Sequence, residues 1–221
     1  MTKASGIVLL AFLLCSCMES ADPSVVAAYR PPPATPVEAP PEADRSFVAG
    51  EHVGGITPDM PMSLVENMYG SDRLESRKLP AGEGTTVPGY VLFPGDSDEL
   101  FIELGDDKQP ARARFSDPRS GWHDAATGLT IGTTLAELHE MNGRPFTFTG
   151  FGWDYGGTVS NWNGGHLENL LVRLTYAPER LPAAGLPEAL LGDVPIASDA
   201  DHIKGMGLRV REITVPIRLE E

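Results

Sequence analysis

Cysteine is nearly absent from this sequence, which contains only Cys15 and Cys17 among 221 residues. The residues after Cys17 contain no cysteine and cannot form an internal disulfide. Core packing must therefore hold the fold. Long hydrophobic runs are also absent. The apolar stretch from Ile7 to Leu14 is too short to span a bilayer.

Signatures of catalysis and of bound metal are missing as well. There is no G-x-S-x-G elbow and no H-E-x-x-H spacing, and the five histidines are scattered. The acidic turns at 96–99 and 199–202 could hold a hard cation, but neither has calcium-loop spacing. We therefore expect no enzyme, no cofactor and no metal site. A hydrolase or metal site assembled around Asp154 and His166 stays open as an alternative.

Basic residues are scarce, with 17 lysines and arginines against 31 acidic residues and a formal net charge of −14. Such a surface argues against nucleic acid as a partner. It also predicts that any partner attracted by the overall charge is basic. The sequence does not predict an oligomeric state.

The N-terminal residues have the features of a targeting signal. Lys3 precedes the apolar run, and the run ends in Leu14-Cys15-Ser16-Cys17, the arrangement of a secretory signal. These residues resemble the lipobox of bacterial lipoproteins. The resemblance implies that residues 1–16 are a signal peptide, that Cys17 carries the lipid, and that the protein is anchored in the outer membrane on the periplasmic side.

A proline-rich segment follows. Residues 21–45 contain seven prolines and little that could form a core. At about 3 Å per residue in a polyproline conformation, such a segment reaches on the order of 80 Å. We therefore expect residues 17–46 to be a lipidated tether and residues 47–221 to be one periplasmic domain.

Two segments of that domain resemble each other. "GITPDMPMSLVENMYG" (55–70) aligns with "GLTIGTTLAELHEMNG" (128–143), and apolar residues recur at every third position in both. The pattern predicts two short amphipathic helices, with capping boxes at Ser63–Glu66 and Thr134–Glu137. Each helix is followed by two strand patterns around a turn: 89–93 and 99–104 in the first segment, 158–163 and 167–176 in the second.

These patterns predict an α+β fold. Two tandem helix-plus-β-hairpin repeats, at about 52–118 and 121–177, would form one antiparallel sheet with the helices on one face. A C-terminal strand region, 186–221, would close the sheet, because Ile213, Val215, Ile217 and Leu219 alternate to one side.

The repeated layout resembles two families, the BamE/SmpA-type outer-membrane assembly lipoproteins and the tandem-repeat β-lactamase-inhibitor proteins. The chain also resembles uncharacterised bacterial lipoproteins with "NGRPF" followed by "GFGWDYGG". These resemblances imply a layout and a location. No functional residue carries over, because no match extends to the contact positions of either family.

The glycine-aromatic stretch "GFGWDYGGTVSNWNGG" (150–165) has two interpretations. As a strand from 145 to 155 with a bulge at Gly150, it would place five aromatic rings on the core side. As a binding patch, it would offer rigid rings beside polar groups. The candidate binding residues are Trp153, Asp154, Tyr155, Asn161, Trp162, Asn163 and His166.

The function expected from these features is that of a membrane-anchored periplasmic lipoprotein, a protein-binding or scaffold module of the cell envelope. The alternative in the same class is an inhibitor of a basic wall-degrading enzyme, which the acidic charge and the inhibitor-like layout favour.

Overall fold

The computed structural model describes residues 44–183 and 185–219. The signal peptide, Cys17 and nearly all of the tether lie outside the described residues. The described chain is mostly β-structure with two α-helices, and neither helix is long and apolar enough to cross a membrane. The helices are α1 (Met62–Tyr69) and α2 (Leu135–Asn142), with short 3-10 turns η1 (Pro178–Arg180), η2 (Glu188–Leu190) and η3 (Asp201–Ile203).

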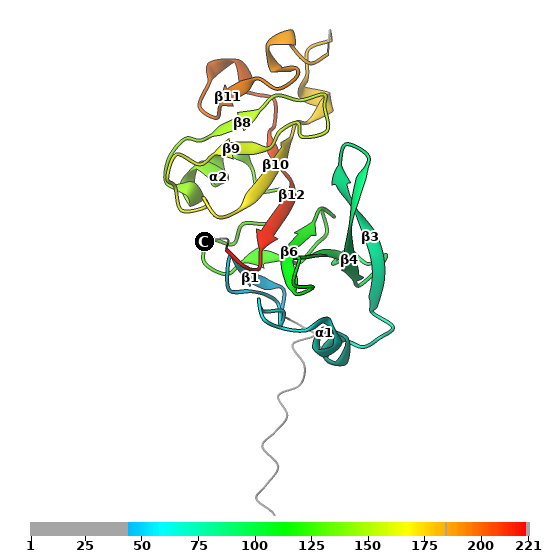
Figure 1. Ribbon diagram of the computed structural model, residues 1–221. Coiled ribbons are helices and arrows are strands. Elements are labelled where there is room, and N and C mark those ends of the chain that lie inside the picture. The colour runs from blue at the N-terminus through cyan, green and yellow to red at the C-terminus, as the bar shows by residue number, and fades with distance from the viewer. Residues whose placement is uncertain (1–43, 184, 220–221) are drawn as a thin grey trace, which may run out of the picture. The chain divides into compact units, whose positions relative to one another are not determined.

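The strands form three sheets (Figure 1). The largest is antiparallel, in the order β10-β12-β6-β5-β4-β3. Its strands are β10 (Leu171–Thr175), β12 (Arg209–Pro216), β6 (Pro110–Phe115), β5 (Leu100–Leu104), β4 (Thr85–Leu92) and β3 (Leu74–Gly82). A second sheet, β2-β1-β7, contains β1 (Ser46–Val48), β2 (His52–Val53) and β7 (His123–Asp124). The third, β11-β8-β9, contains β8 (Thr147–Thr149), β9 (Val159–Asn161) and β11 (Pro195–Ala197).

The predicted fold class is wrong. In the first segment the two predicted strands do pair, as β4 and β5. In the second segment they belong to different sheets, because β9 pairs with β8 whereas β10 pairs with β12. Only one isolated bridge, Thr158 to Arg173, joins the two. The chain therefore does not contain two copies of a helix-plus-hairpin unit.

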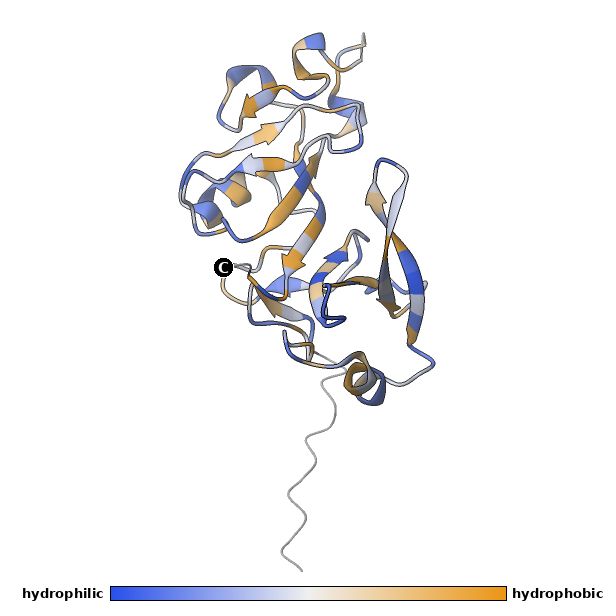
Figure 2. Ribbon diagram, viewed as in Figure 1, coloured by the Kyte–Doolittle hydropathy of each residue, from blue (hydrophilic) through white to orange (hydrophobic). Residues whose placement is uncertain are grey.

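The C-terminal strand also has a different role from the one expected. Ile213, Val215 and Ile217 are fully buried, which confirms their alternation, whereas Leu219 is exposed. β12 does not close an edge of the sheet, since it lies between β10 and β6 and pairs with both. Figure 2 shows apolar and polar residues along β12, as expected for a strand that turns one face toward the core.

Both predicted helices are confirmed. Val65 on α1 and Leu138 on α2 have no exposed surface and belong to one continuous core. Their caps differ, however. Thr134 forms the predicted capping box with Glu137, whereas α1 begins after Pro61 without any side-chain cap, so the capping box at Ser63 is wrong.

This difference gives a matched pair of variants. Thr134→Ala removes a hydroxyl that accepts from the Glu137 N–H and should lower the free energy of unfolding by about 1 kcal/mol. Ser63→Ala, inside α1, should change it by less than about 0.5 kcal/mol. Equilibrium urea unfolding of both proteins measures the two effects. Equal losses would show that the Thr134 cap adds no stability.

The centre of the core is aromatic. Trp122, Phe47 and Phe115 are among the largest side chains with no exposed surface. The Phe115 ring centroid lies 5.9 Å from that of Phe47 and 6.4 Å from that of Trp122. The contact between Phe47 on β1 and Phe115 on β6 joins the β2-β1-β7 sheet to the six-stranded sheet. The three rings supply much of the packing that a domain without disulfides needs.

A buried asparagine fixes the chain beyond α2. Asn142 has no exposed surface, and its Nδ2 donates to the carbonyl oxygens of Arg144 at 2.9 Å and Trp162 at 3.1 Å. Its Oδ1 accepts from the Leu167 N–H at 3.3 Å. A Cβ atom at Gly165 would overlap with the Asn142 side chain. The glycine in this turn therefore allows the close approach that these hydrogen bonds need.

Candidate functional site

The glycine-aromatic stretch divides between core and surface. Phe146, Phe148 and Phe151 are buried, as the strand interpretation predicted. The strand itself is shorter than expected, since β8 ends at Thr149. The predicted bulge at Gly150 is wrong, because the irregularity in this hairpin lies on the β9 side, where Thr147 and Phe148 pair with Asn161 and Val159.

Gly150 serves close packing instead. Its N–H donates to the carbonyl oxygen of Val194 at 2.9 Å. A Cβ atom at this position would lie 2.6 Å from the carbonyl oxygen of Gly192 and 2.8 Å from that of Leu190. Only glycine allows the two backbones to come this close. The chain then turns away from the core, and the next two rings lie outside the core.

Those two rings are Trp153 and Tyr155. They pack edge to face, with centroids 5.4 Å apart at 73°. Tyr155 is 38% exposed, and Trp153 is half-buried with its indole N–H donating to the carbonyl oxygen of Gly150 at 3.0 Å. The exposed Leu191 lies next to this loop, beside Gly152. The loop therefore presents apolar and aromatic surface that the core does not use.

Several hydrogen bonds hold this loop in one conformation. The hydroxyls of Thr149 and Thr158 both donate to the carbonyl oxygen of Tyr155, at 3.0 and 2.7 Å. The Arg173 guanidinium on β10 donates to the carbonyl oxygens of Asp154 and Gly156. A surface fixed in this way loses little conformational entropy when it binds a partner.

Beside the loop is a hollow of about 390 Å³, which we call the Trp153 hollow. Its walls include Phe151, Trp153, Asp154, Leu174, Tyr176 and Arg211. The volume lies within the range of about 300–1,000 Å³ found for ligand sites. Two of its wall residues, Trp153 and Asp154, were predicted from the sequence. Arg211 was not predicted, because it lies in a distant segment whose pattern is that of an ordinary strand.

The pKa of Arg211 is lowered. The first cause is desolvation, because neighbouring atoms displace part of the water around the guanidinium. The second is the nearby cation of Arg173, while Glu212 acts in the opposite direction. Glu212 also forms ion pairs with Arg114 at 3.5 Å and Arg173 at 3.4 Å. The Glu212 carboxylate thus interacts with three guanidinium groups, those of Arg114, Arg173 and Arg211.

The remaining predicted residues do not join this site. The Trp162 ring is buried and its indole N–H donates to the carbonyl oxygen of Leu170. The Asn163 amide donates to the carbonyl oxygen of Pro145, and its backbone N–H donates to Asn161 Oδ1. His166 Nδ1 lies 3.3 Å from the carbonyl oxygen of Met141. These groups shape the turn after β9, at the opposite end of the β8–β9 hairpin from Tyr155.

The structure does not bring Asp154 and His166 together, as the alternative of a hydrolase or metal site around them would require. Asp154 lies in the loop between β8 and β9, and His166 lies beyond β9 next to the end of α2. Within residues 44–183 and 185–219, no three His, Cys, Asp or Glu side chains are grouped so that they could hold a metal ion.

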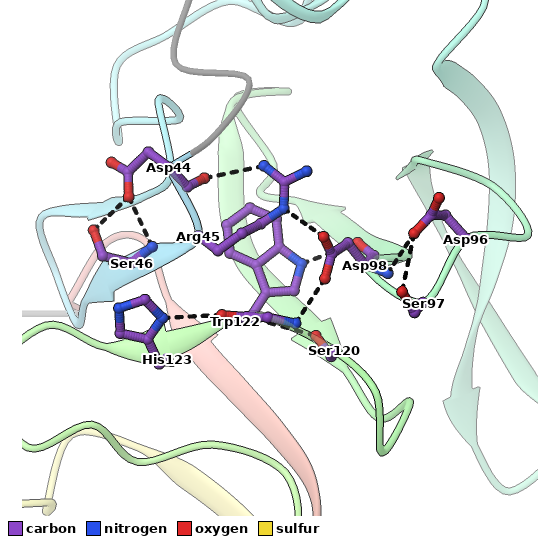
Figure 3. A network of polar contacts seen from close by, with 10 residues as sticks. Asp44, Arg45, Ser46, Asp96, Ser97, Asp98, Ser120, Trp122 and His123 are labelled. Atoms are coloured by element: carbon purple, nitrogen blue, oxygen red, sulfur yellow. Dashed lines mark hydrogen bonds and ion pairs between the residues drawn. The ribbon is translucent and has the colours of Figure 1, made fainter.

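The carboxylates of the first acidic turn are used by the chain itself (Figure 3). The Arg45 Nε donates to Asp98 at 2.7 Å, and its guanidinium lies over the rings of Phe93 at 4.5 Å and Trp122 at 5.2 Å. The indole N–H of Trp122 donates to the carbonyl oxygen of Asp98 at 2.9 Å. Asp96 accepts from the N–H of Asp98 at 3.0 Å. This network has a structural role, because it covers one side of the Trp122 ring.

A larger hollow of about 660 Å³ lies between α2, η1, η3 and the start of β12. It contains a histidine and a serine in contact, with His139 Nε2 2.6 Å from Ser198 Oγ. Ser198 is only 2% exposed, and its Oγ also accepts from the N–H of Phe146 at 2.9 Å. No described side chain orients His139 Nδ1. A nucleophile needs an accessible oxygen and an oriented base, so this pair fastens β11 to α2 and does not form a catalytic dyad.

Comparison with known proteins identifies no family. No protein-family profile matches the chain, and no curated protein is similar to it. Among solved structures, the fold has a distant similarity to the uncharacterized protein yfeY from Escherichia coli. The TM-score is 0.42 at 19% sequence identity, over 77% of this chain and 97% of the other. A similarity this weak supports no function.

Proposed function

We propose that this protein is a lipid-anchored periplasmic protein of the outer membrane whose folded domain binds another envelope protein through the Trp153–Tyr155 loop. The observation that carries the proposal is the presentation of these two rings. They lie outside the core, on a loop that hydrogen bonds hold in place, beside a hollow and an exposed leucine. Preorganised aromatic side chains of this kind are typical of the residues that dominate protein–protein binding.

The anchor and the proline-rich tether support the same proposal from the sequence side. A domain held on a stalk can reach a partner away from the lipid surface. Metabolic labelling with radioactive palmitate tests the anchor: the wild-type chain should become labelled and Cys17→Ser should not. Labelling of the variant would contradict the lipoprotein assignment.

Loss of the indole at position 153 should weaken capture. Trp153→Ala removes the ring that forms one wall of the hollow, and we expect a loss of about 2 kcal/mol in binding, roughly thirtyfold in dissociation constant. To find the partner, a photo-crosslinking phenylalanine analogue replaces Tyr155 in the full-length anchored chain. Irradiation of the native envelope should give one reproducible adduct, which Trp153→Ala should abolish.

The matched control places the crosslinker at Leu64, an exposed apolar residue on α1 that is 46% accessible and does not line the hollow. It should give no such adduct. Urea unfolding of Trp153→Ala must show a folded domain, because the ring is only half-buried. An unfolded variant, or an adduct that persists without Trp153, would overturn the proposed binding surface.

A further inference from the structure

A β-bulge determines where Arg211 points. β10 and β12 pair in register at Arg173 and Glu212 but shift before Leu174, which pairs with Val210. Arg211 is the additional residue on β12. A bulge re-aims the side chain of the inserted residue, and here that side chain forms part of the wall of the Trp153 hollow. An ordinary strand would not place a guanidinium at this position.

The guanidinium of Arg211 is not used by the fold. Among the described residues it has no hydrogen bond, and no carboxylate oxygen lies within ion-pair distance; its one attractive electrostatic interaction is with Glu212, which already pairs with Arg114 and Arg173. The carbonyl oxygens of the neighbouring loop are also engaged, because Arg173 donates to those of Asp154 and Gly156. Arg211 is an exposed residue of β12 that lines the hollow, so its guanidinium is accessible to an anion supplied from outside.

The surroundings of Arg211 further define that anion. Trp153 and Tyr176 bring aromatic rings to the walls of the hollow. The lining contains one cation, Arg211, and one carboxylate, Asp154, so its formal charge is zero, whereas the whole chain has a formal charge of −14. The hollow therefore lacks the excess of negative charge that the whole chain has.

The geometry points to the Trp153 hollow as the site that receives a carboxylate from an acidic peptide segment of the partner. Arg211 is the counter-ion of that carboxylate, and Trp153 packs against an apolar side chain next to it in the peptide. This inference rests on the proposed function and specifies the chemistry of the partner. A carboxylate bound by a guanidinium forms the strong, charge-assisted type of hydrogen bond. The expectation of a basic partner, drawn from net charge alone, is replaced at this surface.

Three tripeptides that differ in one side chain test the inference: acetyl-Leu-Glu-Leu-amide, the glutamine analogue and the lysine analogue. The readout is the indole N–H signal of Trp153 in ¹H–¹⁵N spectra, assigned by its loss in Trp153→Phe. We expect the glutamate peptide to shift this signal in a saturable manner and to bind about tenfold more tightly than the glutamine peptide. The lysine peptide should bind more weakly than both.

Arg211→Gln should remove the preference for glutamate over glutamine. Arg209→Gln is the matched control, because it makes the same charge change two residues earlier on β12 and lines the larger hollow. It should retain the preference. Asp154→Asn removes the negative charge at the hollow and should tighten binding of the glutamate peptide.

Equal binding of the three peptides, no shift with any of them at millimolar concentration, or an unchanged preference in Arg211→Gln would overturn the inference. The proposed binding surface is judged separately. If Trp153→Ala abolishes the envelope adduct while the peptides show no charge preference, the surface stands and only the anion assignment fails. An adduct that persists without Trp153 refutes the surface itself.

Discussion

Trp122→Ala should lower the free energy of unfolding by about 3–5 kcal/mol, the range for a large aromatic side chain removed from a core. The ring has no exposed surface, packs 6.4 Å from Phe115 and lies under the Arg45 guanidinium. Its removal leaves a cavity and frees the carbonyl oxygen of Asp98, which the indole N–H now satisfies. Natural domains have only about 5–15 kcal/mol of stability, so this variant should unfold at a much lower urea concentration.

Two further variants separate the causes of that loss. Trp122→Phe retains most of the apolar volume but not the indole N–H, and should cost less than alanine. Trp153→Ala removes the same side chain from a half-buried loop, and should cost least of the three. The order of the three urea midpoints is the measurement. If Trp122→Ala were no more destabilising than Trp153→Ala, the central role of Trp122 in the core would be refuted.

Asn142→Leu should lower the free energy of unfolding by about 3–5 kcal/mol, although leucine has nearly the same volume and is more apolar. The substitution removes the side-chain partner of two backbone groups, the carbonyl oxygen of Arg144 and the buried N–H of Leu167. The carbonyl oxygen of Trp162 also loses Asn142 but still accepts from the N–H of Gly165. Each such group costs about 1–3 kcal/mol. Hydrogen exchange should also accelerate at the Leu167 amide.

The control for Asn142 is Asn163→Gly, because Asn163 has a φ of 55°, which glycine adopts without strain. Asn163 also donates to a carbonyl oxygen, that of Pro145 at 2.9 Å, but it is exposed, so water can replace the hydrogen bond. We expect a loss below about 1 kcal/mol. A stable Asn142→Leu variant would mean that water or a backbone shift satisfies the Arg144 carbonyl oxygen and the Leu167 N–H, and that Asn142 is dispensable.

The sequence predicted those elements whose signal is local. Apolar residues at every third position identified both helices, and the Thr134–Glu137 spacing identified a genuine cap. The strands β4 and β5 were also identified, because a short turn separates two apolar runs. In each case residues within about ten positions determine the structure.

Pairing between strands was not predicted, because it depends on distant residues. The turn between β9 and β10 has the composition of a hairpin turn, yet Asn142 holds it against α2 and the two strands join different sheets. β3 was missed because it is an edge strand in which the eight residues other than Leu79 are exposed or half-buried, so it has no alternating pattern. β6 does alternate, with Ala113 and Phe115 buried, and that signal was available.

The candidate site shows the same limit. Its aromatic half, Trp153 and Tyr155, was found from composition alone. Its cationic half, Arg211, depends on a one-residue bulge between β10 and β12, which no local pattern in "GLRVREITV" indicates. Asn161, Asn163 and His166 were grouped with the site because they are near it in the sequence, but Asn161 is the last residue of β9 and the other two lie beyond that strand.

The central position of β12 has a consequence for the order in which the strands of the largest sheet can pair. Arg114 and Glu212, on neighbouring strands, are 98 residues apart in the chain. Until β12 is available, β6 and β10 both have an unpaired side, and β10 cannot join the largest sheet. Contacts of such long range slow folding. The strands β3 to β6 can pair as soon as they leave the ribosome, but the sheet is complete only after the C-terminal residues have been synthesised.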